Sequence, residues 1–474
     1  MTDEQNPSQS EQTYRIVPIM IVLISGAFVT ILNQTLLGTA LPQIMLDLNL
    51  SADLAQWLQS VFMLVNGIMI PVTAFLIDRF TTRGLFLTAM GIFSLGTLFA
   101  AIAPSFSILL TGRILQASGA GIMMPLMQTI MFLIFPIEKR GRAMGLFGLV
   151  IAFAPAIGPT LSGWIVDQFD WRVLFYMILP IAIIDIIVAY FILENVTKQT
   201  NPKLDILSII LSTFGFGGFL YGFSVAGSSG WGSTQVIISI VVGVLAIVWF
   251  ILRQLKLDQP ILEFRVFQYK LFTITTVIGM VTFMAMIGAA VVLPLYMQDM
   301  LGFSPVQSGL ALLPGAIMVG VLNPITGTLF DKFGARWLAI IGLAILTITT
   351  LMLSILTTET SFAYIATVNA LRSLGIAMTL MPVTTAGLNS LPTRLIPHGT
   401  AVNNTFRQVS GSIGTALPIT IMIQAANPAE GVSGEVHGVN MSFLVAGIIA
   451  AIGFILAFQI KDRHSKKEVK VRAR

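Results

Sequence analysis

The sequence predicts an all-α integral membrane protein of fourteen membrane-spanning helices, in which two further helices are inserted between two six-helix bundles. Three observations predict this fold: the apolar composition, the distribution of basic residues among the loops, and an internal repeat. Of the 474 residues, 55% are hydrophobic and 10% are charged, whereas about 25% of residues are charged in soluble domains. We therefore expect most of the chain to lie within a lipid bilayer.

Apolar segments of about 20 residues, the length needed to cross a bilayer, recur throughout the chain. The predicted spans cover residues 16–44, 54–77, 84–103, 107–134, 141–166, 172–193, 204–226, 234–252, 271–298, 306–330, 337–356, 361–388, 398–424 and 440–460. A twelve-span arrangement is also even in number, but it leaves the two apolar runs between residues 204 and 252 without a place. The fourteen-span arrangement is therefore preferred.

Basic residues are divided unevenly between the two sets of loops. The loops on the side of both termini hold nearly all the lysine and arginine, whereas the opposite loops hold almost none except Arg172. Loops rich in basic residues stay on the cytosolic side of a membrane. We therefore expect both termini to be cytosolic.

The two halves of the chain carry related loop sequences. "PVTAFLIDRFTTRG" begins at Pro71 and "PITGTLFDKFGARW" begins at Pro324, a spacing of 253 residues. Each copy follows the second span of its half, which predicts two bundles of the same orientation related by an axis along the membrane normal. The charged residues that the copies share are Asp78, Arg79 and Arg83 in the first and Asp331, Lys332 and Arg336 in the second.

These loop charges have two interpretations. In the first, they hold a helix end at the cytosolic surface. In the second, they bias one conformation of two moving bundles, because a surface ion pair contributes little stability by itself. The repeat divides the chain into a cytosolic N-terminal tail, an N-terminal bundle, a two-helix insertion, a C-terminal bundle and a basic cytosolic tail, with predicted limits 1–15, 16–197, 198–257, 258–460 and 461–474.

The composition excludes several classes of function. The chain has no cysteine and three scattered histidines, so disulfides, thiolate sites and metal clusters are not expected, and no cofactor is predicted. It has no glycine-rich nucleotide loop and no cluster of catalytic side chains. We interpret the basic tail as an anchor to anionic lipid and not as a nucleic-acid-binding segment. These observations favour an ion-driven carrier over an enzyme.

One carboxylate stands alone in a predicted span. In "LPIAIIDIIVAYFIL", residues 179–193, Asp185 has no partner nearby in the chain, and at about 1.5 Å per residue it lies near the middle of the membrane. Acidic residues at such depth are costly and often functional. Arg372 and Arg407 lie at similar depth and Arg113 lies further out. A buried carboxyl group whose arginine partner moves can bind and release a proton; a static polar partner and a lipid-facing position are the alternatives.

Four motifs resemble the major facilitator superfamily and, within it, the fourteen-helix drug/proton antiporters of the lincomycin-resistance type of Gram-positive bacteria. "AFLIDRFTTRG" resembles the cytosolic loop motif of that superfamily, and "GRILQASGAGIMMP" resembles its fourth-helix motif. "APAIGPTLSGW" resembles the fifth-helix antiporter motif, and "NNTFRQVSGSIGTALP" resembles the thirteenth-helix signature. The antiporter motif is characteristic of exporters, and its bend is expected at Pro155, Gly158, Pro159 and Gly163.

This resemblance implies a monomeric, proton-coupled multidrug exporter in a bacterial plasma membrane, which moves amphipathic or apolar drug-like compounds by alternating access. It implies roles for Asp185 and Arg113 in proton coupling. The expected substrate cavity contains Asn33, Gln34, Gln116, Met123, Met124, Arg372, Asn403, Asn404 and Arg407. Export of a native metabolite, lipid or signalling nucleotide, and ion-coupled uptake, stay open as alternatives.

The first helix departs from the pattern of that family. It reads "ILNQTLLGTALP", with Asn33 and Gln34 at the places where an acidic residue is usual. Without this acid, we expect the cavity to favour neutral, zwitterionic or anionic compounds over dications.

Overall fold

The computed structural model describes residues 16–461 except 198 and 201. The predicted N-terminal tail and residues 462–474 of the predicted basic tail lie outside the described residues. In the described residues the chain folds into fourteen long helices and a few short helical turns, and it forms no strand. The prediction of an all-α fold with two six-helix bundles and an inserted pair is confirmed.

The helices follow the chain in the order six, two and six. The N-terminal half contains α1 (Ile16–Leu48), α2 (Ala52–Arg79), α3 (Thr82–Ala101), α4 (Phe106–Ile134), α5 (Arg140–Gln168) and α6 (Val173–Ile192). The insertion contains α7 (Ile206–Ser229) and α8 (Thr234–Lys256). The C-terminal half contains α9 (Lys270–Leu295), α10 (Pro305–Phe333), α11 (Arg336–Met352), α12 (Phe362–Asn389), α13 (Ile396–Ala425) and α14 (Val432–Ala457). The residue limits predicted for the tails, bundles and insertion stay a prediction.

Thirteen of these helices are long and apolar enough to cross a membrane. The exception is α13, which has 30 residues but includes His398, Asn403, Asn404 and Arg407, all of them buried. Polar side chains inside a membrane protein face other helices and not lipid. The sequence of α13 is therefore that of an interior helix.

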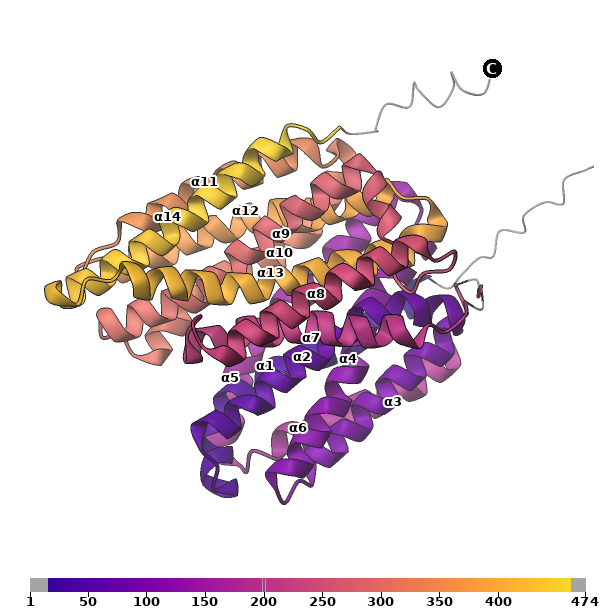
Figure 1. Ribbon diagram of the computed structural model, residues 1–474, viewed down its shortest axis with the longest axis horizontal. Helices are drawn as coiled ribbons and strands as arrows, with labels where there is room; N and C mark the ends of the chain where they lie inside the picture. Colours follow the sequence, from indigo (N-terminus) through magenta and orange to yellow (C-terminus); the bar gives the residue numbers. More distant parts are fainter. Residues whose placement is uncertain (1–15, 198, 201, 462–474) are drawn as a thin grey trace, which may run out of the picture.

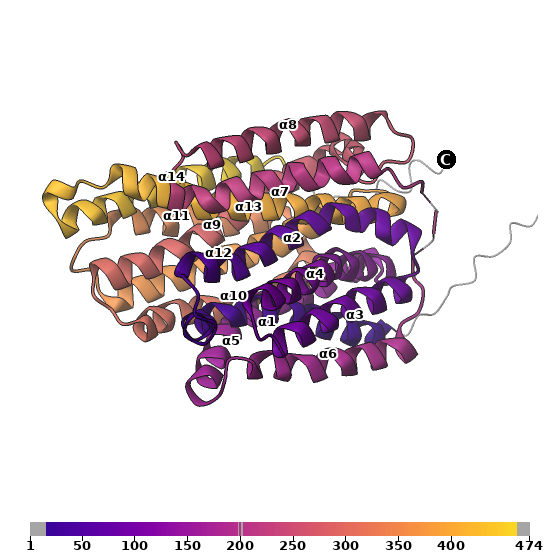
Figure 2. The same ribbon diagram turned by 60° about the horizontal axis from the view of Figure 1, so that its bottom comes forward.

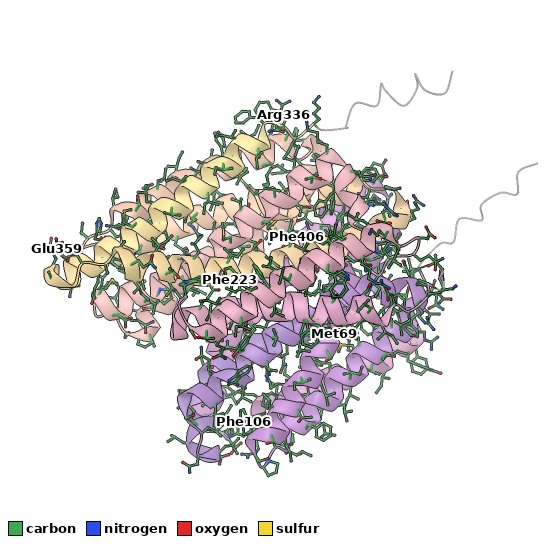
Figure 3. All side chains as sticks on the ribbon, in the orientation of Figure 1. Met69, Phe106, Phe223, Arg336, Glu359 and Phe406 are labelled. Atoms are coloured by element: carbon green, nitrogen blue, oxygen red, sulfur yellow. The ribbon has the colours of Figure 1, made fainter. Side chains whose placement is uncertain are left out.

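The two halves meet at one end of the molecule and separate at the other. Figure 1 shows them together at the end where the chain termini leave, and apart at the opposite end. We call these the closed end and the open end. Figure 3 shows α11 running between them, with Arg336 at its start, at the closed end, and Glu359 beyond its other end, at the open end.

The inserted helices α7 and α8 pack along one side of the molecule (Figure 2). In α7, Leu220 contacts Gly67 of α2 in the N-terminal half, while the loop residue Trp231 donates a hydrogen bond of 2.5 Å to Thr420 of α13 in the C-terminal half. At the closed end, Arg253 of α8 lies 2.7 Å from the Asp205 carboxylate before α7. The hydrogen bonds that Arg253 donates to Asp205 hold the pKa of the Asp205 carboxyl group below its usual range. The insertion therefore contacts both halves.

Small residues bring neighbouring helices of each half into close contact. A Cβ atom added to Gly112 of α4 would lie 2.8 Å from the Gly96 carbonyl of α3. The corresponding pair in the other half is Gly375 of α12, where a Cβ would lie 2.5 Å from the Gly342 carbonyl of α11. Such close approach depends on glycine. These contacts fix α4 and α12, the helices that carry Arg113 and Arg372.

Candidate functional site

The closed end is held by the two copies of the repeated loop. At the end of α10, Asp331 accepts hydrogen bonds from the backbone N–H groups of Gly141 at 2.7 Å and Arg142 at 2.9 Å. At the end of α2, Asp78 lies 3.1 Å from Nε2 of His398. Each aspartate therefore reaches the first turn of a helix in the opposite half, α5 or α13. A carboxylate is stabilised at a helix N-terminus, where unpaired N–H groups carry partial positive charge.

The other predicted loop charges have different surroundings. Arg79 donates to the Pro202 carbonyl at 3.1 Å, and the Arg83 guanidinium lies 4.3 Å from the centre of the Tyr190 ring. Lys332 and Arg336 are exposed at the closed end. Of the predicted loop charges, Asp78 and Asp331 are thus seen in direct contact with the opposite half.

A second polar layer lies deeper, between α4 and α13. The hydroxyl oxygens of Thr129 and Thr400 are 2.7 Å apart, and Asn404 donates to Gln128 at 2.6 Å. All four side chains are buried. This layer continues the contact of the two halves from the closed end toward the centre of the molecule.

Helices α5 and α10 approach each other closely over the same region. A Cβ added to Gly141 would collide with the Gly327 carbonyl, and one added to Gly320 would collide with the Phe153 ring. The hinge role predicted for the antiporter motif concerns other residues of α5. Among them, Gly158 packs against Thr35 of α1, Gly163 has no neighbour within 4 Å of an added Cβ, and Pro155 and Pro159 are exposed. The hinge role of these four residues stays a prediction.

A cavity with about 480 Å³ of empty space lies between the halves. Its lining comes from α1, α2 and α4 on one side and from α9 and α13 on the other: Thr30, Ile31, Gln34, Asn66, Ile70, Ala120, Met124, Phe283, Asn404, Arg407 and Gln408. Four of the predicted cavity residues are brought together here, namely Gln34, Met124, Asn404 and Arg407. We call this the central cavity.

Arg407 gives the central cavity its only charged lining group among the described residues. The guanidinium lies 4.8 Å from the centre of the Phe283 ring, and its Nη1 atom has no hydrogen-bond partner in the described part of the chain. A cation over an aromatic face, beside amide side chains, suits a ligand with apolar surface and a polar or negatively charged group.

Two other predicted cavity residues, Asn33 and Gln116, lie inside the N-terminal bundle together with Arg113, which was predicted for proton coupling, and the substrate role of the two stays a prediction. Arg113 donates to Gln116 at 2.9 Å, and Gln116 donates to Thr97 at 3.0 Å and to Asn33 at 3.4 Å. Arg113 also lies 4.3 Å from the centre of the Phe62 ring. These hydrogen bonds hold the side chains inside the N-terminal bundle, although Nη2 of Arg113 and Nδ2 of Asn33 have no partner in the described residues, and none of the three lines the central cavity.

Three further residues also lie outside the central cavity. Met123 is fully buried next to Gly26 of α1. Asn403 is buried, and its Oδ1 atom has no partner in the described residues. Arg372 lines a separate cavity within the C-terminal bundle. None of the three is among the lining residues of the central cavity.

Asp185 lies between α6 and α1. Its Oδ1 atom accepts a hydrogen bond of 2.5 Å from the Ser25 hydroxyl, and its Oδ2 atom has no partner in the described residues. The side chain is buried, and it is the only acidic residue in the buried class of the described chain. No arginine forms an ion pair with it among the described residues, so the expected arginine partner is absent from this conformation and Arg113 is not brought to it.

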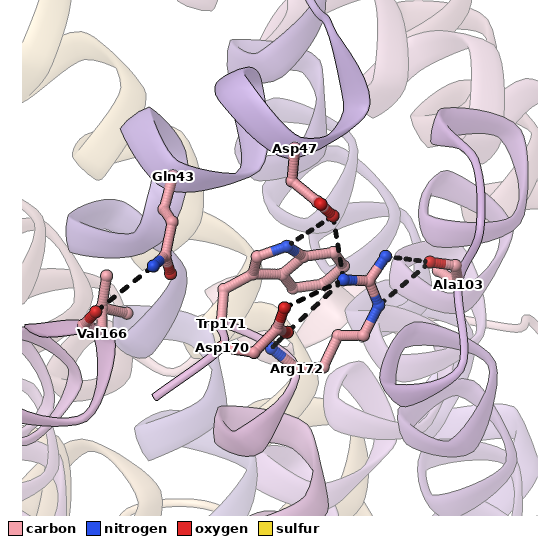
Figure 4. A network of polar contacts seen from close by, with 7 residues as sticks. All are labelled: Gln43, Asp47, Ala103, Val166, Asp170, Trp171 and Arg172. Atoms are coloured by element: carbon pink, nitrogen blue, oxygen red, sulfur yellow. Dashed lines mark hydrogen bonds and ion pairs between the residues drawn. The ribbon is translucent and has the colours of Figure 1, made fainter. Parts of the chain in front are cut away.

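Sequence reasoning missed a polar network at the open end of the N-terminal half (Figure 4). Asp47 of α1 accepts from Trp171 at 3.1 Å and from Arg172 at 2.9 Å. Arg172 also donates to the Ala103 carbonyl at 2.8 Å. The network joins loops of one half only. The sequence held one sign of this network, namely Arg172, the single basic residue among the loops at the open end.

We expect Asp331→Ala to loosen the closed end, because the charged hydrogen bonds to the first turn of α5 contribute about 1 kcal/mol or more. Thr400→Cys gives a buried reporter in a chain without native cysteine. Maleimide should label this reporter about five to ten times faster when Asp331→Ala is also present. Lys332→Gln, an exposed neighbouring charge, is the control. Equal labelling rates in all three proteins would show that Asp331 does not hold the halves together.

The fold and the central cavity define a multi-pass membrane carrier, in which two helical halves enclose a site for a small molecule. The profile of the Major Facilitator Superfamily matches residues 23–415, and the chain belongs to this superfamily. It is a multi-pass membrane transporter with bacterial relatives. The family and the names of these relatives indicate a carrier and not an enzyme.

Two relatives and one solved structure extend the comparison. The chain is 55% identical over 459 residues to the uncharacterized MFS-type transporter YcnB of Bacillus subtilis (strain 168), a match that covers 96% of this chain and 97% of that one. It is 42% identical over 470 residues to the lincomycin resistance protein LmrB of the same organism, covering 96% and 98%. The crystal structure of the human organic anion transporter MFSD10 (TETRAN) superposes with a TM-score of 0.69 at 12% identity, covering 93% and 99%, and shows the shared fold.

Proposed function

We propose that the protein is a multidrug efflux antiporter that exports amphipathic or apolar compounds, antibiotics among them, in exchange for protons. The observation that carries the proposal is the central cavity, which lies between two halves that meet at one end and separate at the other. Such a cavity can exchange its contents with one side of the membrane at a time. The likeness to a lincomycin resistance protein over nearly the full length supports export of drug-like compounds.

The proposed direction of transport rests on charge. Exposed basic side chains such as Arg142, Lys332 and Arg394 gather at the closed end, so we assign this end to the cytosol by the positive-inside rule. The conformation described here is then open to the outside. Release of the contacts made by Asp78 and Asp331 would open the cavity to the cytosol for loading.

The proposed coupling ion is the proton, and Asp185 is the proposed site. A buried carboxylic acid can exchange a proton near neutral pH. Asp185 has one oxygen hydrogen-bonded to Ser25 and one without a partner in the described residues. Arg113 is the second predicted member of the pathway, with a role through the network that includes Gln116 and Asn33.

The direct test is drug accumulation in cells that express the protein, with and without a protonophore. We expect lower accumulation of lincosamide-like and other amphipathic compounds, and loss of this difference when the protonophore is present. Substrate movement is then compared in right-side-out and inverted vesicles. Uptake into right-side-out vesicles, or a difference that survives the protonophore, would contradict proton-driven export.

We expect Arg407 to set the charge preference of the central cavity. Arg407→Gln removes its only charged lining group in the described chain and should weaken transport of anionic or zwitterionic compounds about tenfold, because one favourable charge contact in a partly desolvated site contributes about 1.4 kcal/mol. Neutral compounds should be affected little. Arg407→Lys keeps the charge and is the matched control. Stronger transport of quaternary dications than of anionic compounds by the unmodified protein would contradict this preference.

A further inference from the structure

The two contacts that hold the closed end differ in the groups that donate to the aspartates. Asp331 accepts from backbone N–H groups at the start of α5, among them that of Gly141 at the second position of this helix. The second position of α13 is Pro397, and proline has no N–H group to donate. Here Asp78 lies 3.1 Å from Nε2 of the His398 ring instead. The Asp78 contact therefore depends on the orientation of one side chain.

The linker between α8 and α9, residues 257–269, holds the His398 ring. The backbone N–H group of Glu263 donates to Nδ1 of His398 at 3.2 Å. Because Nδ1 accepts this hydrogen bond, the neutral ring carries its proton on Nε2 and donates it to Asp78. His398 is buried, which limits rotation of the ring. The N–H group of Glu263 therefore fixes both the tautomer and the direction of the ring.

The inserted helices hold this linker in turn. Gln254, near the end of α8, accepts from the backbone N–H group of Leu262 at 3.3 Å and donates to the Ser208 hydroxyl of α7 at 2.6 Å. Ser208 donates to the Asp205 carboxylate at 2.6 Å. Gln254, Ser208 and Leu262 are 0% exposed, so these hydrogen bonds are shielded from water. A series of hydrogen bonds therefore leads from α7 through Gln254 to the backbone next to Glu263.

We propose that Gln254 is a positioning residue for the closed end. Gln254 holds the linker at Leu262, the linker holds the ring of His398, and the ring donates to Asp78. The inserted helices, which belong to neither six-helix bundle, thereby stabilise one of the two contacts between the halves. The inference rests on the alternating access that the proposed function includes, but not on the direction of transport or on the coupled ion.

The test measures the rate at which maleimide labels Thr129→Cys in the full chain, in nanodiscs and without substrate. Thr129 is buried in α4, and the native chain has no cysteine. The labelling rate follows the fraction of molecules in which the closed end has opened. Gln254→Met keeps the length of the side chain and removes its hydrogen bonds. We expect it to raise the labelling rate about fivefold, the effect of one lost hydrogen bond.

Paired variants show whether Gln254 acts through His398. His398→Ala removes the donor to Asp78 and should also raise the labelling rate about fivefold. Because both changes break the same series of hydrogen bonds, Gln254→Met should add nothing to the effect of His398→Ala. When it is combined with Asp331→Ala, which weakens the other contact, the two effects should multiply. Multiplication in the pair with His398→Ala would overturn the proposal, because Gln254→Met would then act by general destabilisation.

A matched pair of serine variants keeps the proposal falsifiable if Gln254→Met folds poorly. Ser208→Ala and Ser212→Ala each remove a buried hydroxyl group, one turn apart on α7. The Ser208 hydroxyl accepts from Gln254, whereas the Ser212 hydroxyl has no partner in the described residues. We expect faster labelling in Ser208→Ala and an unchanged rate in Ser212→Ala. Equal rates in the two variants would overturn the role of the series.

A conservative change at His398 tests the ring as the donor. The amide group of His398→Gln can donate to Asp78, so we expect this variant to label more slowly than His398→Ala. Labelling needs neither substrate nor an ion gradient, which separates this inference from the proposed function. Drug accumulation that a protonophore does not change would contradict proton-driven export and leave this inference in place. An unchanged labelling rate in Gln254→Met would overturn this inference and leave the proposed export in place.

Discussion

Asp185→Asn is expected to abolish proton-driven export and to leave substrate binding measurable. Asparagine cannot exchange a proton at any accessible pH, yet its side-chain oxygen can still accept the hydrogen bond that the Ser25 hydroxyl donates to Asp185. The shape of the site between α6 and α1 is therefore kept, and only the titratable group is removed. The Asp185→Asn variant therefore distinguishes a role of Asp185 in proton coupling from a static structural role.

The measurement uses proteoliposomes with an imposed pH gradient. We expect uphill transport by Asp185→Asn to fall to background, while exchange of labelled for unlabelled substrate, which needs no net proton movement, continues. Continued exchange also shows that the variant is folded. Normal antiport by this variant would remove Asp185 from the mechanism and favour a static partnership with Ser25.

Ser25→Ala is the matched control for this experiment. It removes the hydrogen bond of 2.5 Å to Asp185 but keeps the carboxyl group. Loss of that bond changes the relative stability of the charged and neutral forms of the group. We therefore expect Ser25→Ala to retain proton-driven transport with a shifted pH profile. A complete loss in Ser25→Ala with normal transport in Asp185→Asn would indicate that packing between α1 and α6, and not proton exchange, is what matters.

The second large effect is expected from a disulfide between α4 and α13. The Thr129 and Thr400 hydroxyl oxygens are 2.7 Å apart across the two halves, and the sulfur atoms of a disulfide are about 2.05 Å apart. Thr129→Cys combined with Thr400→Cys should cross-link on oxidation and hold the closed end shut. Because the native chain has no cysteine, no other disulfide can form within it.

Transport by the oxidised double variant should fall to background and return when a reductant is added. Thr82→Cys combined with Thr197→Cys is the control, since those hydroxyl oxygens are 2.9 Å apart but both belong to the N-terminal half. Its cross-link should leave transport unchanged. Loss of free thiol verifies that each double variant is cross-linked. Transport at the unmodified rate by the protein cross-linked between α4 and α13 would show that the halves do not separate at the closed end.

The number, order and approximate limits of the helices were predictable from the sequence because each span must be long and apolar. The faces of those helices were not. A helix surrounded by lipid and by other apolar helices has little polar asymmetry, so the usual periodic signal of a buried face is weak. This explains why the fold was predicted better than the lining of the cavity.

Adjacent residues show this most clearly. In α1, Asn33 faces the bundle interior while Gln34 lines the central cavity. In α4, Met123 is buried against α1 while Met124 lines the central cavity. Successive residues of a helix point about 100° apart, since one turn takes about 3.6 residues. Both members of each pair were predicted for the cavity, and only the packing of the helices separates them.

The contacts between the halves could not be predicted from the sequence either. The repeat identified Asp78 and Asp331 as a matched pair, but it did not indicate their partners. His398 and the backbone of Gly141 lie in the opposite halves from these aspartates. Residues so distant in the chain meet only when the two bundles dock, which depends on shape and not on local pattern.

The polar character of α13 has a consequence for how the protein is made. Each charged or amide side chain at the centre of a helix opposes its transfer from the translocon into lipid, and α13 is the one long helix in the described chain that falls short of the apolar character of a span. It therefore needs α9, α4 and its other neighbours to shelter Asn404 and Arg407 during synthesis. Both α4 and α9 precede α13 in the chain, so the order of the helices supplies these neighbours before α13 reaches the membrane.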